Sequence, residues 1–293
     1  MKTLIANFSQ HIKTALETIS NTKLKPAQGN IHNVVITGLG GSGIGGSIVS
    51  ELVAPEANLP ILVNKDYHVP AFVNEGTLLI ACSYSGNTEE TLSAVRQALK
   101  SGAQVACISS GGELKKMAES QGWNCLSMEG GNPPRSMFGY SFSFLLHYLK
   151  HYGIIKTDVL AELKTSVNLL DGEQENIKSQ AEELAKNLEN PIPHILAVGG
   201  YHGVAVRWRQ QLNENSKMLC WAAEIPEMNH NELVGWEGGD KRFSALFLRN
   251  ENDYDRNQKR IDIIKGIIAG KTEHVHEVWS KGSSNIQRAL YLI

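Results

Sequence analysis

The sequence predicts an α/β protein made of parallel β-sheets that helices cover on both faces. Short apolar, β-rich runs alternate with helix-like runs along most of the 293 residues, and the alternation starts again after a long charged stretch near the middle. Strands buried on both faces lack the polar–apolar alternation of a half-exposed sheet, and strand–helix alternation is typical of parallel sheets. The length favours two such domains.

The first half contains five predicted strands, each short and almost entirely apolar. They lie at residues 33–37, 60–64, 77–82, 104–109 and 124–128. A glycine-rich turn and a helix that runs through Val53 follow the first strand, helix-like runs at 88–100 and 113–121 separate the last three, and an apolar helix at 141–152 closes the half. We therefore expect a first domain at residues 1–152.

The second half repeats the pattern after a charged, amphipathic helical region at residues 156–190, which Pro191 and Pro193 terminate. The predicted strands lie at 194–198, 218–224, 242–248 and 274–279, and the predicted helices at 203–217, 255–269 and 284–293. We expect these elements to form a second domain at residues 153–293.

Composition excludes several classes of protein. Apolar residues make up 42% of the chain and charged residues 20%, and a net charge of −2 argues against nucleic acid as the main partner. No secretory signal is visible at the N-terminus, and no apolar run is long enough to span a bilayer. Cys82 and Cys107 lie in predicted buried strands, the usual place for reduced thiols. A cytoplasmic enzyme or sugar-binding protein is expected.

A hydroxyl-rich loop is the most informative local feature. Ser83, Ser85 and Thr88 lie between the end of a predicted strand and the start of a helix, and Gly86 allows the backbone to bend. Unpaired amides and the helix dipole favour an anion at a helix N-terminus, and hydroxyl groups add neutral donors. The pattern predicts a phosphate site; the alternative is that Thr88 simply caps the helix.

A glycine-rich loop follows the first predicted strand and contains a literal GxGxxG, GLGGSGIGG at residues 38–46. Alone, it would indicate a dinucleotide site with Asp66 as the ribose partner, and hence a nicotinamide-dependent oxidoreductase. The other interpretation is that the backbone near Gly41 approaches a sugar phosphate and Ser42 donates a further hydroxyl. Both loops would then converge at the carboxyl ends of parallel strands, where open α/β sheets bind ligands.

Five segments together resemble those of a known family. They are GLGGSGIGG (38–46), SYSGNTEET (83–91), NPPRSMFGYSF (132–142), NENSK (213–217) and PEMNHNELVGWE (226–237). The chain is similar, from about residue 33 to its end, to the bifunctional phosphoglucose/phosphomannose isomerases of the sugar-isomerase (SIS) domain superfamily. The resemblance implies two SIS-type domains, each a parallel sheet flanked by helices in a three-layer sandwich, and an active homodimer.

The resemblance implies an aldose–ketose isomerase that interconverts glucose 6-phosphate and mannose 6-phosphate with fructose 6-phosphate and needs no metal or cofactor. By position, the residues that would hold the phosphate and sugar are Gly41, Ser42, Ser83, Ser85 and Thr88. Arg135 would lie near the reacting carbons, Glu214 matches the catalytic base, and His230 matches a ring-opening histidine that comes from the partner subunit.

These residue types suit the chemistry. One carboxylate can move a proton between neighbouring carbons, an imidazole can give or take a proton near neutral pH, and a guanidinium can stabilise an enediolate. Each also has a simpler interpretation: Glu214 as a solvated helix residue, His230 as a surface histidine and Arg135 as a surface ion pair. His202 is a lesser candidate by position, and the histidines of HVHEVW (274–279) are expected to be strand-edge residues rather than metal ligands.

The C-terminus differs from the family pattern. Members use a lysine and a nearby hydroxyl residue on a C-terminal helix that continues past an apolar run such as 289–293, and these have no match here; Lys281 has the wrong context. Either the C-terminus is shortened or the ring-handling step differs. A second functional class remains open, a non-catalytic sugar-phosphate sensor that keeps the Ser83–Thr88 loop.

Overall fold

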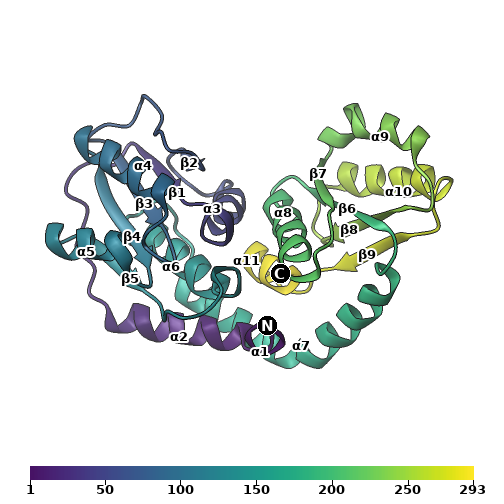
Figure 1. Cartoon of the computed structure of the whole chain (residues 1–293), viewed down its shortest axis with the longest axis horizontal. Helices are drawn as coiled ribbons and strands as arrows, with labels where there is room; N and C mark the ends of the chain where they lie inside the picture. Colours follow the sequence, from purple (N-terminus) through teal and green to yellow (C-terminus); the bar gives the residue numbers. More distant parts are fainter. The chain divides into compact units, whose positions relative to one another are not determined.

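The computed structural model describes residues 1–293, which form two compact units, Met1–Val167 and Asn168–Ile293 (Figure 1). Each unit contains one parallel sheet with helices packed on it, as the sequence predicted. Helix α7 (Val159–Asn187) contains the boundary between the units. No helix combines the length and apolar character needed to cross a membrane.

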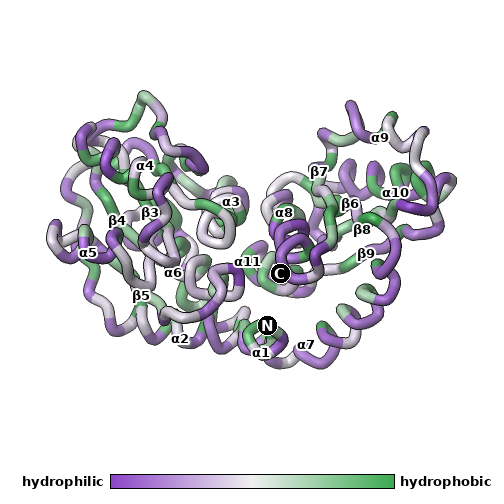
Figure 2. The backbone as a smooth tube through the Cα atoms, in the orientation of Figure 1, coloured by the Kyte–Doolittle hydropathy of each residue, from purple (hydrophilic) through white to green (hydrophobic).

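The sheet of the first unit has five strands in the order β2-β1-β3-β4-β5, all parallel. The strands are β1 (Asn33–Thr37), β2 (Ile61–Asn64), β3 (Thr77–Cys82), β4 (Gln104–Ser109) and β5 (Asn124–Ser127). The central strands carry the apolar colour of Figure 2 and are buried along their length. Cys82 is fully buried, and burial raises the pKa of its thiol to about 12, which fits a structural thiol.

Helices cover both faces of this sheet. The helical elements of the unit are α1 (Lys2–Ala6), α2 (Phe8–Asn21), α3 (Gly40–Val53), α4 (Glu89–Lys100), α5 (Gly112–Gln121), the 3-10 turn η1 (Pro134–Ser136) and α6 (Phe138–His151). Helices α4 and α5 share a buried core with the face that carries Val35. Helix α3 packs on the opposite face, where a Cβ on Gly46 would lie 2.8 Å from the Ile36 side chain. The first unit is thus a three-layer sandwich.

Helix α2 was not among the predicted elements. Its buried face, which includes His11, Ile12, Ala15 and Ile19, packs against α6, where Gly139 leaves room for it. The amphipathic pattern of these residues was visible in the sequence, but only the contact with α6 explains which face is buried.

The second unit has a four-stranded parallel sheet in the order β7-β6-β8-β9. The strands are β6 (Ile192–Val198), β7 (Trp221–Ile225), β8 (Phe243–Arg249) and β9 (Val275–Trp279). The other elements are α8 (His202–Gln211), the π-helical turn η2 (Leu212–Ser216), η3 (Glu227–His230), α9 (Glu232–Gly235), η4 (Trp236–Gly238), α10 (Asp255–Ala269) and α11 (Asn285–Leu292). Helices α8 and α10 lie on opposite faces of this sheet (Figure 1).

Two predicted boundaries in the second unit were wrong. The helix expected at 203–217 ends at Gln211 and widens into the π-helical turn, and the strand expected at 218–224 begins only at Trp221. Leu219, apolar in sequence, is 84% exposed. Apolar character alone therefore placed the start of this strand too early.

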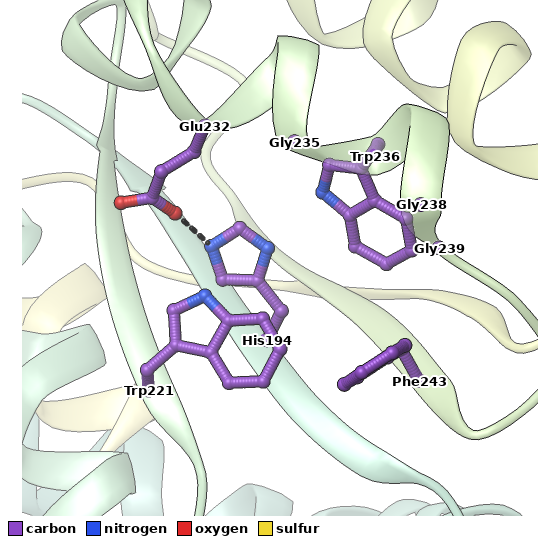
Figure 3. Close-up of a pocket in the computed structure, with 8 residues that line it drawn as sticks. All are labelled: His194, Trp221, Glu232, Gly235, Trp236, Gly238, Gly239 and Phe243. Carbon is purple, nitrogen blue, oxygen red and sulfur yellow. Dashed lines mark ion pairs between the residues drawn. The ribbon is translucent and has the colours of Figure 1, made fainter.

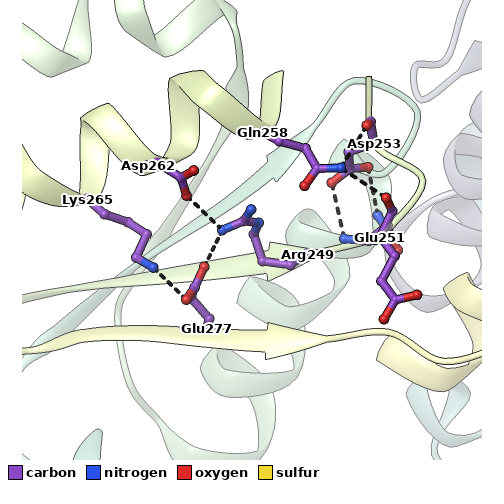
Figure 4. A network of polar contacts seen from close by, with 8 residues as sticks. Arg249, Glu251, Asp253, Gln258, Asp262, Lys265 and Glu277 are labelled. Carbon is purple, nitrogen blue, oxygen red and sulfur yellow. Dashed lines mark hydrogen bonds and ion pairs between the residues drawn. The ribbon is translucent and has the colours of Figure 1, made fainter. Parts of the chain in front are cut away.

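A buried ion-pair network fixes the end of β8 (Figure 4). The Arg249 side chain is buried, pairs with Glu277 of β9 and lies 3.7 Å from the Asp262 carboxylate of α10. Glu277 also accepts from Lys265 Nζ at 2.5 Å. The Arg249 guanidinium stacks over the Trp279 ring at 4.5 Å. A buried guanidinium is tolerated only when it is paired in this way, so the network holds α10 and β9 to the central strands.

Candidate active site

Both loops that were selected from the sequence lie at the carboxyl-terminal end of the first sheet. The strand order reverses at β1, because β2 pairs on one side of it and β3 on the other. The glycine-rich loop follows β1 and the Ser83–Thr88 loop follows β3, so both lie at the carboxyl ends of the two strands that flank this switch point. A crevice at such a point is where open α/β sheets bind ligands.

The glycine-rich loop contacts two other candidate segments. A Cβ on Gly41 would lie 3.1 Å from the backbone of Arg135, so the absence of a side chain lets the two backbones approach closely. The Ser42 hydroxyl accepts a hydrogen bond from the Tyr84 amide at 3.1 Å. The structure therefore brings Gly41, Ser42 and Arg135 together with the hydroxyl-rich loop.

The hydroxyl-rich loop is held by its own side chains. Ser83 Oγ and Thr88 Oγ1 share a hydrogen bond of 2.9 Å, the Gly86 amide donates to Ser83 Oγ at 3.1 Å, and the Asn87 amide donates to Ser85 Oγ at 3.2 Å. Thr88 occupies the N-cap position of α4, but its side chain makes no capping bond. The simple capping interpretation is therefore wrong, and the helix N-terminus keeps its anion-attracting character.

Gly86 has a strict requirement for glycine. Its φ is +70°, and an added Cβ would lie 1.8 Å from the Gly111 carbonyl oxygen. We expect Gly86→Ala to lower the free energy of unfolding by about 2–4 kcal/mol, because it adds a clash to left-handed strain. Gly131→Ala is the matched control, since φ there is +86° with no atom within 4 Å of the added Cβ; it should cost about 1 kcal/mol. Urea unfolding of both variants checks this, and equal losses would contradict it.

Arg135 lies in η1, directly after Pro133 and Pro134. The preceding segment is fixed to the hydroxyl-rich loop, because the Asn132 amide donates to the Tyr84 hydroxyl at 2.9 Å. Tyr84 therefore ties three candidate segments together through its backbone amide and its hydroxyl. Sequence reasoning missed this role, although the position of Tyr84 between two candidate serines was the available signal.

Glu214 lies in the second unit, in the π-helical turn that continues α8. Its side chain is exposed, and Lys217 ends the turn in a left-handed conformation (φ +57°) while its Nζ donates to the Glu214 carbonyl oxygen at 2.7 Å. Single π-helical turns within helices recur at functional sites, and a left-handed non-glycine residue is uncommon. Glu214 therefore lies in an uncommon backbone conformation of a kind that recurs at functional sites.

A buried arginine precedes Glu214 by seven residues on the same helical region. Arg207 of α8 is 6% exposed, and burial lowers the pKa of its guanidinium to about 9, while the negative charge of Glu214 acts in the opposite direction. Sequence reasoning did not select Arg207 among the arginines of the chain. Its spacing from Glu214, two helical turns, was the only signal.

His230 lies at the end of η3, in the segment between β7 and β8. Its side chain is exposed, whereas Met228 two residues earlier is buried. His202 begins α8, and its Nδ1 is buried without a hydrogen-bond partner. The second unit thus holds both Glu214 and His230, and the first unit holds the other predicted site residues.

Two of the weaker sequence candidates have plain structural explanations. Asp66 lies in an exposed turn after β2, where its carboxylate accepts from the Tyr67 amide at 2.6 Å. His274 directly precedes β9 and His276 lies within it, and β9 is an edge strand of the second sheet, as the sequence predicted.

A curated bifunctional phosphoglucose/phosphomannose isomerase from Caldicellulosiruptor bescii is 38% identical to this chain over 300 residues, which cover 99% of the chain and 88% of that protein. The chain belongs to the bifunctional phosphoglucose/phosphomannose isomerase family. The resemblance that the five motifs indicated is confirmed. A second member of the family, from Thermoplasma acidophilum, is 36% identical and covers 90% of this chain and 81% of its own length.

A family model and a solved structure agree on the fold. A family model for the C-terminal SIS domain of bacterial phospho-glucose isomerase matches residues 177–293. The C-terminal domain of glucosamine-fructose-6-phosphate aminotransferase from Francisella tularensis superposes with a TM-score of 0.76 at 15% identity, covering 97% of this chain and 90% of that one. The predicted α/β fold of two SIS-type domains is therefore confirmed for this member of the isomerase family.

Proposed function

We propose that this chain is an aldose–ketose isomerase that interconverts glucose 6-phosphate and mannose 6-phosphate with fructose 6-phosphate. The observation that carries the proposal is the hydroxyl-rich loop beside the glycine-rich loop at the β1–β3 switch point, in a chain whose relatives are named for this activity. Helices α3 and α4 begin directly after these two loops, so amides and hydroxyls would bind a phosphate without a charged side chain.

Glu214 would carry the proton. As a carboxylate it removes the C2 proton of the open-chain aldose to give an enediolate, then returns that proton to C1, while the O2 proton moves to O1 and C2 becomes the ketone. The enediolate is more negative than the sugar, so a guanidinium from Arg135 would stabilise the transition state more than the substrate.

His230 would open the sugar ring, giving a proton to the ring oxygen and taking one from the C1 hydroxyl. Its exposed place between β7 and β8 suits a residue that reaches a neighbouring molecule, so we assign it to the site of a second copy of the chain. The proposal accordingly includes a homodimer, a cytoplasmic location and no requirement for a cofactor.

Incubation with fructose 6-phosphate tests the proposal. We expect both glucose 6-phosphate and mannose 6-phosphate to accumulate to equilibrium when the reaction is followed by ¹³C NMR. A folded protein that binds fructose 6-phosphate in a calorimeter but produces neither aldose would contradict the proposal and identify the chain as a sensor. Added NADH should leave the reaction unchanged, because no nicotinamide takes part.

A further inference from the structure

The segment that carries His230 lacks the long helix of an ordinary strand–helix–strand crossover. Residues 226–242 leave β7 at one side of β6 and return to the sheet as β8 at the other side, so they cross β6. They contain only the short turns η3, α9 and η4. Such short turns bury little surface of their own, so their position depends on individual side-chain contacts with the sheet.

His194 of β6 supplies the central contact (Figure 3). Its side chain is completely buried and lies between two tryptophan rings, with centroid distances of 4.7 Å to Trp221 and 5.9 Å to Trp236 and interplanar angles of 22° for both. Phe243 of β8 meets both tryptophans edge-on. Trp236 belongs to the crossing segment, so this stack joins the segment to the first residues of β7 and β8.

The same imidazole forms an ion pair with the segment. His194 Nε2 lies 2.9 Å from Glu232 Oε2, a close contact between charged groups that lacks hydrogen-bond alignment, and Nδ1 has no hydrogen-bond partner. The contact with His194 is the main reason that the pKa of the Glu232 carboxyl lies below its usual range. The Asn231 side chain also accepts from the Glu232 amide at 2.6 Å.

The segment packs tightly at one point and loosely at another. A Cβ on Gly239 would lie 2.7 Å from Trp236 Cε3, so the glycine lets the chain pass close to the indole. A cavity of about 300 Å³ lies among His194, Trp221, Glu232, Trp236 and Phe243. Part of the segment therefore lacks packed neighbours, so its position depends more strongly on the contacts with His194.

We propose that His194 is a positioning residue for ring opening: through Glu232 and Trp236 it fixes the segment that carries His230. Glu232 follows His230 by two residues and Trp236 follows it by six, so both anchors lie within the same short segment. His194 itself is buried and touches no substrate. The inference rests on the proposed function for its catalytic part, but the anchoring can be tested without activity.

Amide hydrogen exchange measures the anchoring directly. We expect His194→Phe, which keeps an aromatic ring but loses the ion pair, and Glu232→Gln to raise exchange in residues 227–238 by about tenfold or more, while β6 and β8 keep their protection. Lys265→Gln is the matched control, because it breaks a partly buried ion pair in the same unit that has no link to this segment. Unchanged exchange in both variants would overturn the proposal, whether or not the protein is an isomerase.

A double-mutant cycle tests the catalytic part. Glu232→Gln should lower kcat for cyclic fructose 6-phosphate about tenfold with KM changed less than threefold, and should have no further effect in a His230→Ala background. An equal loss of kcat in both backgrounds would show that Glu232 does not act through His230. Failure of the unaltered protein to turn over the sugar would instead count against the proposed function, and the exchange result would still stand.

Discussion

Replacing Glu214 with glutamine should abolish isomerisation while sparing the binding of sugar phosphate. The amide cannot accept the C2 proton, so kcat should fall by about a thousandfold or more, at the upper part of the range for general-base catalysis. The substitution keeps the size and polarity of an exposed side chain, so stability should change by less than about 0.5 kcal/mol. Deuterium incorporation from D₂O into fructose 6-phosphate, followed by NMR, measures the proton transfer itself.

The matched control for this experiment is Glu182→Gln, which changes an exposed glutamate on α7 of the same unit. It should exchange deuterium at the rate of the unaltered protein. Calorimetry should give the same affinity for fructose 6-phosphate with all three proteins, within about threefold. Normal exchange in Glu214→Gln would remove this residue from the mechanism and leave the carboxylate to be found elsewhere.

Replacing Arg135 with glutamine should lower kcat by about 100- to 1000-fold with a smaller change in KM. The guanidinium is proposed to act on charge that develops only in the enediolate, and loss of one such fixed donor typically has an effect of this size. Arg135→Lys should be intermediate, because lysine keeps the positive charge but lacks the planar pair of donors. Initial rates with fructose 6-phosphate give both constants.

Arg96→Gln provides the comparison for Arg135. Arg96 lies in the same unit and pairs with Glu113 on the exposed surface, where an ion pair contributes little. It should change neither kcat nor KM measurably. If Arg135→Gln lowered affinity as much as it lowered kcat, then Arg135 would be a binding residue for the ground state rather than a stabiliser of the enediolate.

The first unit could be predicted well because its signals are local. Each strand is a short apolar run, and Ser83, Ser85 and Thr88 stand between one such run and a helix, so the position of the loop follows from the parallel fold. The hydrogen bonds that connect the two loops could not be predicted from the sequence. The bond from the Tyr84 amide to Ser42 links residues 42 positions apart, and no periodic pattern reports it.

The second unit was harder to predict because tertiary contacts override its local pattern. Residues 212–216 continue directly from α8, yet they form a π-helical turn that ends at the left-handed Lys217, and nothing in the local pattern distinguishes this turn from an α-helical one. The short turns after β7 read only as a polar loop, because their anchor His194 lies more than thirty residues earlier in the chain. The catalytic roles of Glu214 and His230 therefore remain predictions, which the variants above address.

Both sheets grow outward from the earliest strand of their unit, and this has a consequence for biosynthesis. Strand β1 gains its neighbours only when residues 61–64 and 77–82 have left the ribosome, and the first sheet needs nothing beyond Ser127. The second sheet uses only residues 192–279. The leading half can therefore complete its hydrogen-bonded framework while the trailing half is still being translated, which keeps the exposed edges of one nascent sheet from pairing with the other.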